Sequence, residues 1–211
     1  MSKKTIIFDF DGTIANTLDA VVNIYNRIAP RFHCRIVQQE DRIKLQSQKP
    51  QAFLKSYGVS NFKLPFLLLR VRKELRSEIA DIKLIKDIFK PLQDIKNAGF
   101  NLGIMTSNSK ENVNIFLEIN GLIGVFDFIY SGNNIFGKDK KIKRLLQEQK
   151  IQKDSAVYVG DETRDIEAAK KVGIPIVAVS WGFNTKEILA ALRPNAIVDD
   201  PNQLLEYLRK F

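Results

Sequence analysis

The sequence predicts an α/β protein: a parallel β-sheet flanked by helices, with an all-helical segment inserted after the first strand. The first observation is the short apolar run Thr5-Ile6-Ile7-Phe8, which indicates a strand buried on both faces. The second is that no convincing strand pattern occurs between Thr17 and about Ile82. The third is the alternation of strand and helix patterns from about residue 85 onward, which implies a parallel sheet with right-handed crossovers.

The inserted segment contains four helix patterns. We expect helices over residues 18–28, 40–46, 50–57 and 63–79. Thr17 precedes the first and is expected to be its N-cap, and Pro50 suits the start of the third. On the fourth, Arg70, Arg72 and Arg76 are expected to face outward or toward a cleft.

The remainder of the chain supplies the other strands of the sheet and the helices between them. We expect strands over residues 101–106, 127–131, 155–161, 174–180 and 196–199, and helices over residues 91–98, 110–120, 139–150, 163–172 and 202–210. The predicted organisation is therefore a core formed by residues 1–15 and 85–211, and a helical domain formed by residues 16–84.

Composition narrows the class of protein. Of 211 residues, 45% are hydrophobic and 27% are charged, and no apolar run approaches the ~20 residues of a membrane span. The N-terminus lacks the pattern of a signal peptide, so we expect a cytoplasmic protein with no membrane partner. The net charge of +9 favours anionic partners, but the basic residues are spread over helices without a nucleic-acid-binding motif. A small phosphorylated substrate is the expected partner, nucleic acid is not, and the oligomeric state is not predicted.

Two acids directly follow the first strand, in Asp9-Phe10-Asp11-Gly12-Thr13. The carboxyl ends of parallel strands are where an open sheet binds ligands. Residues two apart in a strand point the same way, so Asp9 and Asp11 converge there unless the backbone turns between them. Two like charges at that distance require a cation.

Other strand ends supply complementary groups. Thr106, Ser107 and Asn108 follow the second predicted strand, Lys138 comes shortly after the third, and Asp161 follows the fourth. Carboxylates that converge without His or Cys fit Mg²⁺ better than zinc. Phosphoryl transfer needs a nucleophile, an acid, a metal and a fixed cation acting together, and these strand ends offer the protein groups of that set, including carboxylates that could hold the metal.

Together, the stretch from Asp9 to Thr13, Thr106, Lys138 and Gly160-Asp161 with Asp165 resemble the four motifs of the haloacid dehalogenase superfamily, in its phosphatase branch. The stretch 177–184 is similar to one in the phosphoglycolate phosphatase-like subgroup. The resemblance implies a Rossmann-like core in which the helical domain is a small cap, although this cap is short.

Roles also follow from the resemblance. It implies that Asp9 is the nucleophile, forming an aspartyl-phosphate, that Asp11 is the acid and base, and that Thr106 and Lys138 complete the catalytic set. The substrate-binding residues expected beside them are Gly12, Thr13, Ser107 and Asn108. The expected Mg²⁺ ligands are Asp9, Asp11, Asp161 and Asp165.

Several alternatives stay open. Lys140 or Lys141 is an alternative phosphate ligand to Lys138, and Ser107 is the alternative to Thr106. A phosphomutase or another phosphotransferase would use the same residues, and a non-catalytic binding protein would keep only the fold. We further hypothesise that an arginine of the helix over 63–79 contacts a second anionic group of the substrate.

Overall fold

The computed structural model describes residues 3–132 and 137–211; Met1 and Ser2, at the start of the predicted core, lie outside them. Its centre is a six-stranded sheet with strand order β3-β2-β1-β4-β5-β6, in which every neighbouring pair is parallel. The strands are β1 (Thr5–Phe8), β2 (Asn101–Thr106), β3 (Phe128–Ser131), β4 (Ala156–Gly160), β5 (Ile176–Val179) and β6 (Ala196–Val198). The predicted parallel α/β fold is confirmed.

Helices cover both faces of the sheet. They are α5 (Phe89–Asn97), α6 (Lys110–Ile119), α7 (Lys138–Glu148), α8 (Thr163–Val172), α9 (Lys186–Ala191) and α10 (Leu204–Leu208). Side chains alternate along β1, so Ile6 and Phe8 enter a core with α5, α6 and α10, and Ile7 enters one with α7, α8 and α9. Helix α9 was not expected from the sequence.

The inserted segment is helical, as expected. It contains α1 (Leu18–Ile28), α2 (Arg42–Gln46), α3 (Pro50–Ser56) and α4 (Lys63–Glu78), with the 3-10 helices η1 (Ala29–Phe32) and η2 (Gln39–Asp41). Helix α1 packs against α4, where Arg27 pairs with Glu74 and Glu78. Thr17 occupies the N-cap position of α1, as expected, although its side chain makes no capping hydrogen bond.

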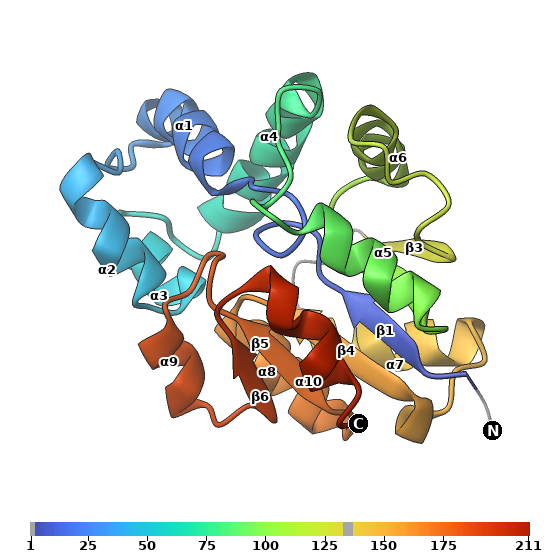
Figure 1. Cartoon of the computed structure of the whole chain (residues 1–211). Helices are drawn as coiled ribbons and strands as arrows, with labels where there is room; N and C mark the ends of the chain where they lie inside the picture. Colours follow the sequence, from blue (N-terminus) through green and yellow to red (C-terminus); the bar gives the residue numbers. More distant parts are fainter. Residues whose placement is uncertain (1–2, 133–136) are drawn as a thin grey trace.

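The segment lies beyond the carboxyl end of β1, as Figure 1 shows. Its two connections to the core run side by side, because the Asn16 N–H donates to the Lys83 carbonyl (2.9 Å) and the Ile85 N–H donates to the Ile14 carbonyl (2.8 Å). The boundaries predicted at residues 15–16 and 84–85 stay a prediction.

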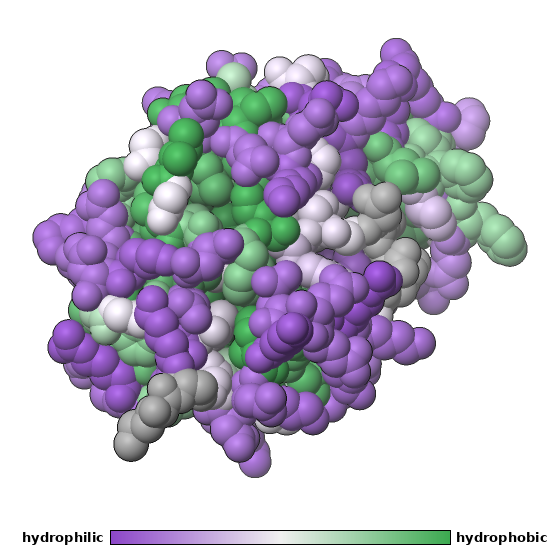
Figure 2. Space-filling model, turned by 90° about the vertical axis from the view of Figure 1, so that its right-hand side faces the viewer, coloured by the Kyte–Doolittle hydropathy of each residue, from purple (hydrophilic) through white to green (hydrophobic). Residues whose placement is uncertain are grey.

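Figure 2 shows one face on which hydrophilic residues surround smaller hydrophobic areas. Within the described residues, no helix has the length and apolar character that crossing a membrane requires.

Candidate active site

Asp9 lies at the carboxyl end of β1, between two neighbouring strands. The register pairs Phe8 with Ile104 of β2 and with Val159 of β4, so the residue after Phe8 stands at the centre of the sheet edge. The Asp9 side chain is buried, and its Oδ1 accepts a hydrogen bond from the Phe10 N–H (2.8 Å). The carboxylate is therefore held in one orientation.

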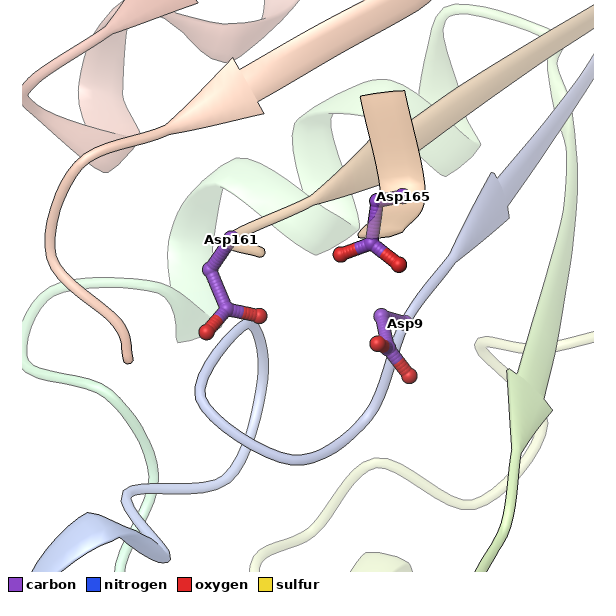
Figure 3. Close-up of side chains that lie close together, drawn as sticks. All are labelled: Asp9, Asp161 and Asp165. Carbon is purple, nitrogen blue, oxygen red and sulfur yellow. The ribbon is translucent and has the colours of Figure 1, made fainter. Parts of the chain in front are cut away.

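Three carboxylates meet at this edge. Asp9, Asp161 after β4, and Asp165 in the first turn of α8 each place an oxygen within 4.8 Å of the others, and all three are buried. Figure 3 shows the three side chains gathered around a common space. Burial, together with the charges of Glu162, Asp165 and Asp9, raises the pKa of Asp161 well above its ordinary value. The cluster is thus short of positive charge.

Lys138 is the cation that this cluster contacts. It is the first residue of α7, and its Nζ lies 2.5 Å from Oδ2 of Asp9 and also pairs with Asp165. Burial alone lowers the pKa of Lys138, but Asp165 and Asp9 outweigh it and hold that pKa well above the ordinary value. Lys140 is exposed, so the structure favours Lys138 over Lys140 as the lysine of the site.

The loop after β1 holds Asp161 in place. The Thr13 hydroxyl donates to Asp161 Oδ1 (2.6 Å), and the Phe183 N–H donates to Oδ2 (2.7 Å). Gly12 has φ +79°, and a Cβ there would collide with the Asp161 carboxylate and the Phe183 ring. Glycine is required at this position on both grounds.

Asp11 lies near the cluster but outside it. It is not one of the three carboxylates that come within 4.8 Å of each other. Burial, reinforced by the charge of Asp9, raises the pKa of Asp11 to about 7. Its predicted place among the metal ligands therefore stays a prediction, whereas a proton-carrying role suits a carboxyl that titrates near neutral pH.

The predicted residues after β2 are grouped at the same edge. The Thr106 hydroxyl accepts from the Asn108 N–H (2.8 Å), and Asn108 Oδ1 accepts from the Asn112 side chain (2.8 Å). The Asn108 carbonyl accepts from the Ser131 hydroxyl (2.5 Å), which joins this turn to β3. These bonds leave the Thr106 proton available for donation.

A cavity of about 240 Å³ lies between this edge and the helical segment. We call its lining residues between 105 and 184, with Asp9 and Asp11, the floor, and its lining residues between 18 and 75 the roof. The floor includes Thr106, Ser107 and Lys138. The roof is apolar except for Arg72 and the Tyr25 hydroxyl, which donates to the Arg35 carbonyl (2.8 Å).

Not every predicted contact residue lines this cavity. Among the described lining residues, Gly12 and Thr13 do not occur, because Gly12 packs on Asp161 and Thr13 bonds to it. Of the three arginines on α4, Arg70 pairs with Glu74 and Arg76 with Glu111, and Arg72 alone lines the cavity.

Sequence reasoning missed several cavity residues. The buried Glu162 pairs with Arg164, whose side chain is partly exposed (Oε1 to Nη2, 2.5 Å), and both line the floor. Asn184 connects the core to the helical segment. Its Oδ1 accepts a hydrogen bond from the Thr163 N–H, and its Nδ2 donates to the carbonyls of Gln46 and Gln48. In the sequence, the one feature that pointed to Glu162, Arg164 and Asn184 was their position beside predicted motifs.

The chain is similar to known phosphatases. The family model described as haloacid dehalogenase-like hydrolase matches residues 6–179. A phosphoglycolate phosphatase of Synechococcus elongatus is 34% identical over 203 residues, covering 96% of each protein. The pyrophosphatase PpaX of Bacillus mycoides is 21% identical over 225 residues, covering 100% of this chain and 99% of that protein.

Solved structures share the fold. A predicted phosphatase from Clostridium acetobutylicum superposes with a TM-score of 0.85 at 21% identity and covers 100% of both chains. A predicted phosphoglycolate phosphatase from Haemophilus somnus has a TM-score of 0.77 at 18% identity and covers 98% of both chains.

Proposed function

The chain belongs to the haloacid dehalogenase-like hydrolase family and is a phosphatase of that family, and we propose that it hydrolyses a small phosphomonoester through an aspartyl-phosphate on Asp9. The observation that carries the proposal is the position of Asp9 at the cavity floor, with one carboxylate oxygen on Lys138 (2.5 Å) and two further acids beside it.

In the first half-reaction, a carboxylate oxygen of Asp9 attacks phosphorus, and the bond between phosphorus and the ester oxygen breaks. Asp11 donates its proton to the departing alkoxide, which leaves as an alcohol. Asp11 then accepts a proton from water, the resulting hydroxide attacks the aspartyl-phosphate, and Asp9 and inorganic phosphate are released. Burial and Asp9 raise the pKa of Asp11 to about 7, so both protonation states are accessible near neutral pH.

Phosphate oxygens need donors in both steps. Lys138 and the Thr106 hydroxyl line the floor beside Asp9 and are placed to supply them, with Ser107 and Asn108 next to Thr106. A fixed ammonium at this position offsets the charge that accumulates when a carboxylate approaches a phosphate dianion.

The acidic cluster fits a hard divalent cation. Its donors are carboxylate oxygens, they are buried, and Lys138 is the cation that pairs with them. Mg²⁺ prefers oxygen ligands of this kind. Asp9, Asp161 and Asp165 are the residues that would hold it, and when bound it would screen the negative charge between nucleophile and phosphate.

The helical segment 16–84 is proposed to act as the cap. It forms the roof of the cavity, and its apolar lining excludes water from the floor. A dry site strengthens each charge interaction around the phosphate. Gln46, the last residue of α2, and Gln48, in the loop before α3, accept hydrogen bonds from Asn184 of the core. These bonds fix the position of the cap on the core.

The test uses p-nitrophenyl phosphate with and without Mg²⁺. We expect Mg²⁺-dependent turnover and a loss of at least about 10⁴-fold in kcat for Asp9→Asn, in line with removal of a catalytic nucleophile. Asp154→Asn, which changes an exposed acid, is the matched control. Turnover without metal, or turnover that survives Asp9→Asn, would refute the mechanism.

A second readout addresses the metal without turnover. Mg²⁺ should raise the melting temperature of the wild-type protein, because a ligand that binds only the folded state stabilises it. Asp161→Asn should remove most of that shift. An equal shift in both proteins would place the metal elsewhere.

A further inference from the structure

Tyr158 is the one residue of β4 with a polar side chain. The side chain is completely buried (0% exposed), and its hydroxyl has no hydrogen-bond partner of regular geometry among the residues that the structure describes. A buried hydroxyl without a partner destabilises a fold, so phenylalanine would suit this position better on packing alone. The hydroxyl therefore needs an explanation other than the packing of the core.

The Tyr158 side chain lies against Lys138. The strand register pairs Tyr158 with Ile7, and both side chains belong to the core that β1 and β4 form with α7 and α8. Lys138, the first residue of α7, places its Nζ over the Tyr158 ring, 5.4 Å from the ring centre, which is within the range of a cation–π contact. Lys138 lines the cavity, whereas Tyr158 is not among the described lining residues. Tyr158 therefore contacts the ammonium from the core side and does not reach the cavity itself.

The charges around Tyr158 keep its hydroxyl protonated. Burial, and then the charge of Asp9, raise the pKa of Tyr158 well above its ordinary value, and Lys138 opposes them through its charge and as a hydrogen-bond donor. A neutral phenol can accept a hydrogen bond through its oxygen. The ammonium of Lys138 is thus a donor available to the buried hydroxyl.

The ammonium of Lys138 needs restraint, because lysine carries its charge at the end of a flexible stem of four carbons. Asp9 and Asp165 restrain it through N–H donors that a substrate phosphate would also use. A contact on the core side is different, because no substrate competes for it. Such a contact would keep the ammonium beside Asp9 while its donors turn to the phosphate oxygens.

We propose that Tyr158 is a positioning residue, whose ring and hydroxyl oxygen hold the Lys138 ammonium beside Asp9. This inference rests on the proposed phosphatase function and adds to it a residue that touches neither the substrate nor the attacking carboxylate. Its effect should fall on kcat, because the ammonium offsets charge that accumulates as the carboxylate approaches phosphorus.

The experiment is Tyr158→Phe, which keeps the ring and removes the hydroxyl. We expect kcat for p-nitrophenyl phosphate to fall about 10-fold, as for loss of a hydrogen bond to a charged group, with KM within about threefold of wild type. The melting temperature should stay the same or rise, because the change removes a buried hydroxyl without a regular partner. A purely structural role predicts the opposite pattern, a lower melting temperature with unchanged kcat.

Tyr57→Phe is the matched control. Tyr57 is also buried (1% exposed), its hydroxyl also lacks a partner of regular geometry within the described residues, and Arg35 lies 5.1 Å from the centre of its ring. It belongs to the helical segment and is not among the described residues that line the cavity. Tyr57→Phe should leave kcat unchanged. An equal fall in kcat for both variants would overturn the proposal, because the effect would then follow from any buried tyrosine.

A double variant tests whether Tyr158 acts through Lys138. In a Lys138→Met background there is no ammonium to hold, so Tyr158→Phe should cause no further fall in kcat. If the two substitutions instead multiply their effects, Tyr158 acts on the floor independently of Lys138 and the positioning role is wrong.

The outcomes also separate this inference from the proposed function. If p-nitrophenyl phosphate is hydrolysed through Asp9 while Tyr158→Phe keeps the wild-type kcat, the positioning role is wrong and the phosphatase function stands. If turnover survives Asp9→Asn, both proposals fail together.

Discussion

The floor and the roof of the cavity differ in the polarity of their side chains. The floor consists largely of charged and polar groups held by short hydrogen bonds, such as Lys138 on Asp9 at 2.5 Å and the Asn108 N–H on Thr106 at 2.8 Å. The roof consists of aliphatic and aromatic side chains from a helical segment, with Arg72 as its charged residue. We infer from this difference that the floor carries out the chemistry, whereas the roof mainly encloses the substrate.

After the loss of the nucleophile Asp9, the largest expected effect is that of removing the floor's lysine, Lys138. Lys138→Met leaves Asp9 and Asp165 without their shared cation and removes the positive charge beside the phosphate. We expect kcat for p-nitrophenyl phosphate to fall about 10²- to 10³-fold, the scale for loss of one charge-stabilising donor. Steady-state assays of folded protein, checked by circular dichroism, measure the effect.

Lys143→Met is the control for that change, because it alters an exposed lysine of the same helix. A kcat within fivefold of wild type for Lys138→Met would mean that the floor does not depend on this ammonium.

A substitution in the roof should lower the stability of the protein more than it lowers kcat. Leu67 is 1% exposed and lines the roof, whereas Leu69 on the same helix is 58% exposed. Leu67→Ala should lower the free energy of unfolding by about 2–5 kcal/mol, and Leu69→Ala by less than about 0.5 kcal/mol, in urea denaturation. We expect kcat for p-nitrophenyl phosphate to change less than tenfold, and a loss as large as that of Lys138→Met would break the comparison.

The floor was largely predictable from the sequence, for a topological reason. In a parallel sheet every strand ends at the same edge, so Asp9, Thr106 and Asp161 had to meet once their strands were recognised. Lys138 was harder, because it stands in a basic run, and only its contact with Asp9 and Asp165 separates it from Lys140.

The helices that form the roof were predictable from the sequence, but the side chains that they present to the cavity were not. Helical spacing located α4, yet it did not reveal which of its arginines enters the cavity, because that depends on how α4 packs against α1 and the core. Arg70 and Arg76 are held outside by Glu74 and Glu111, and these pairs exist only in the folded protein. Helix α9, which has six residues, was not predicted either.

A smaller effect concerns pH. Burial and the cations Lys138 of α7, Arg164 of α8 and Arg72 of α4 lower the pKa of Lys141 to about 8, against the opposing charge of Asp9 on the floor. Lys141 is therefore charged at pH 7 and mostly neutral at pH 9. If Lys141 contributes its charge to binding of the substrate phosphate, KM for p-nitrophenyl phosphate should rise about tenfold over that range.

Lys141→Arg should remove this pH dependence, because arginine does not titrate there. A KM for p-nitrophenyl phosphate that stays constant between pH 7 and pH 9 in the wild-type protein would contradict an electrostatic role for Lys141.

The smallest expected effect lies where floor and roof meet. Asn184 is buried, and its Nδ2 donates to the carbonyls of Gln46 (3.0 Å) and Gln48 (3.1 Å) while its Oδ1 accepts from the Thr163 N–H (2.9 Å). Asn184→Ala removes both donors and the acceptor without adding a charge, so the hydrogen bonds between the core and the helical segment are lost. We expect KM to rise a few-fold with kcat little changed, as loss of about 1 kcal/mol predicts, whereas Asn202→Ala on the exposed surface should change neither. A hundredfold fall in kcat would instead show that Asn184 positions the floor, and the division between the two sides of the cavity would not hold at this residue.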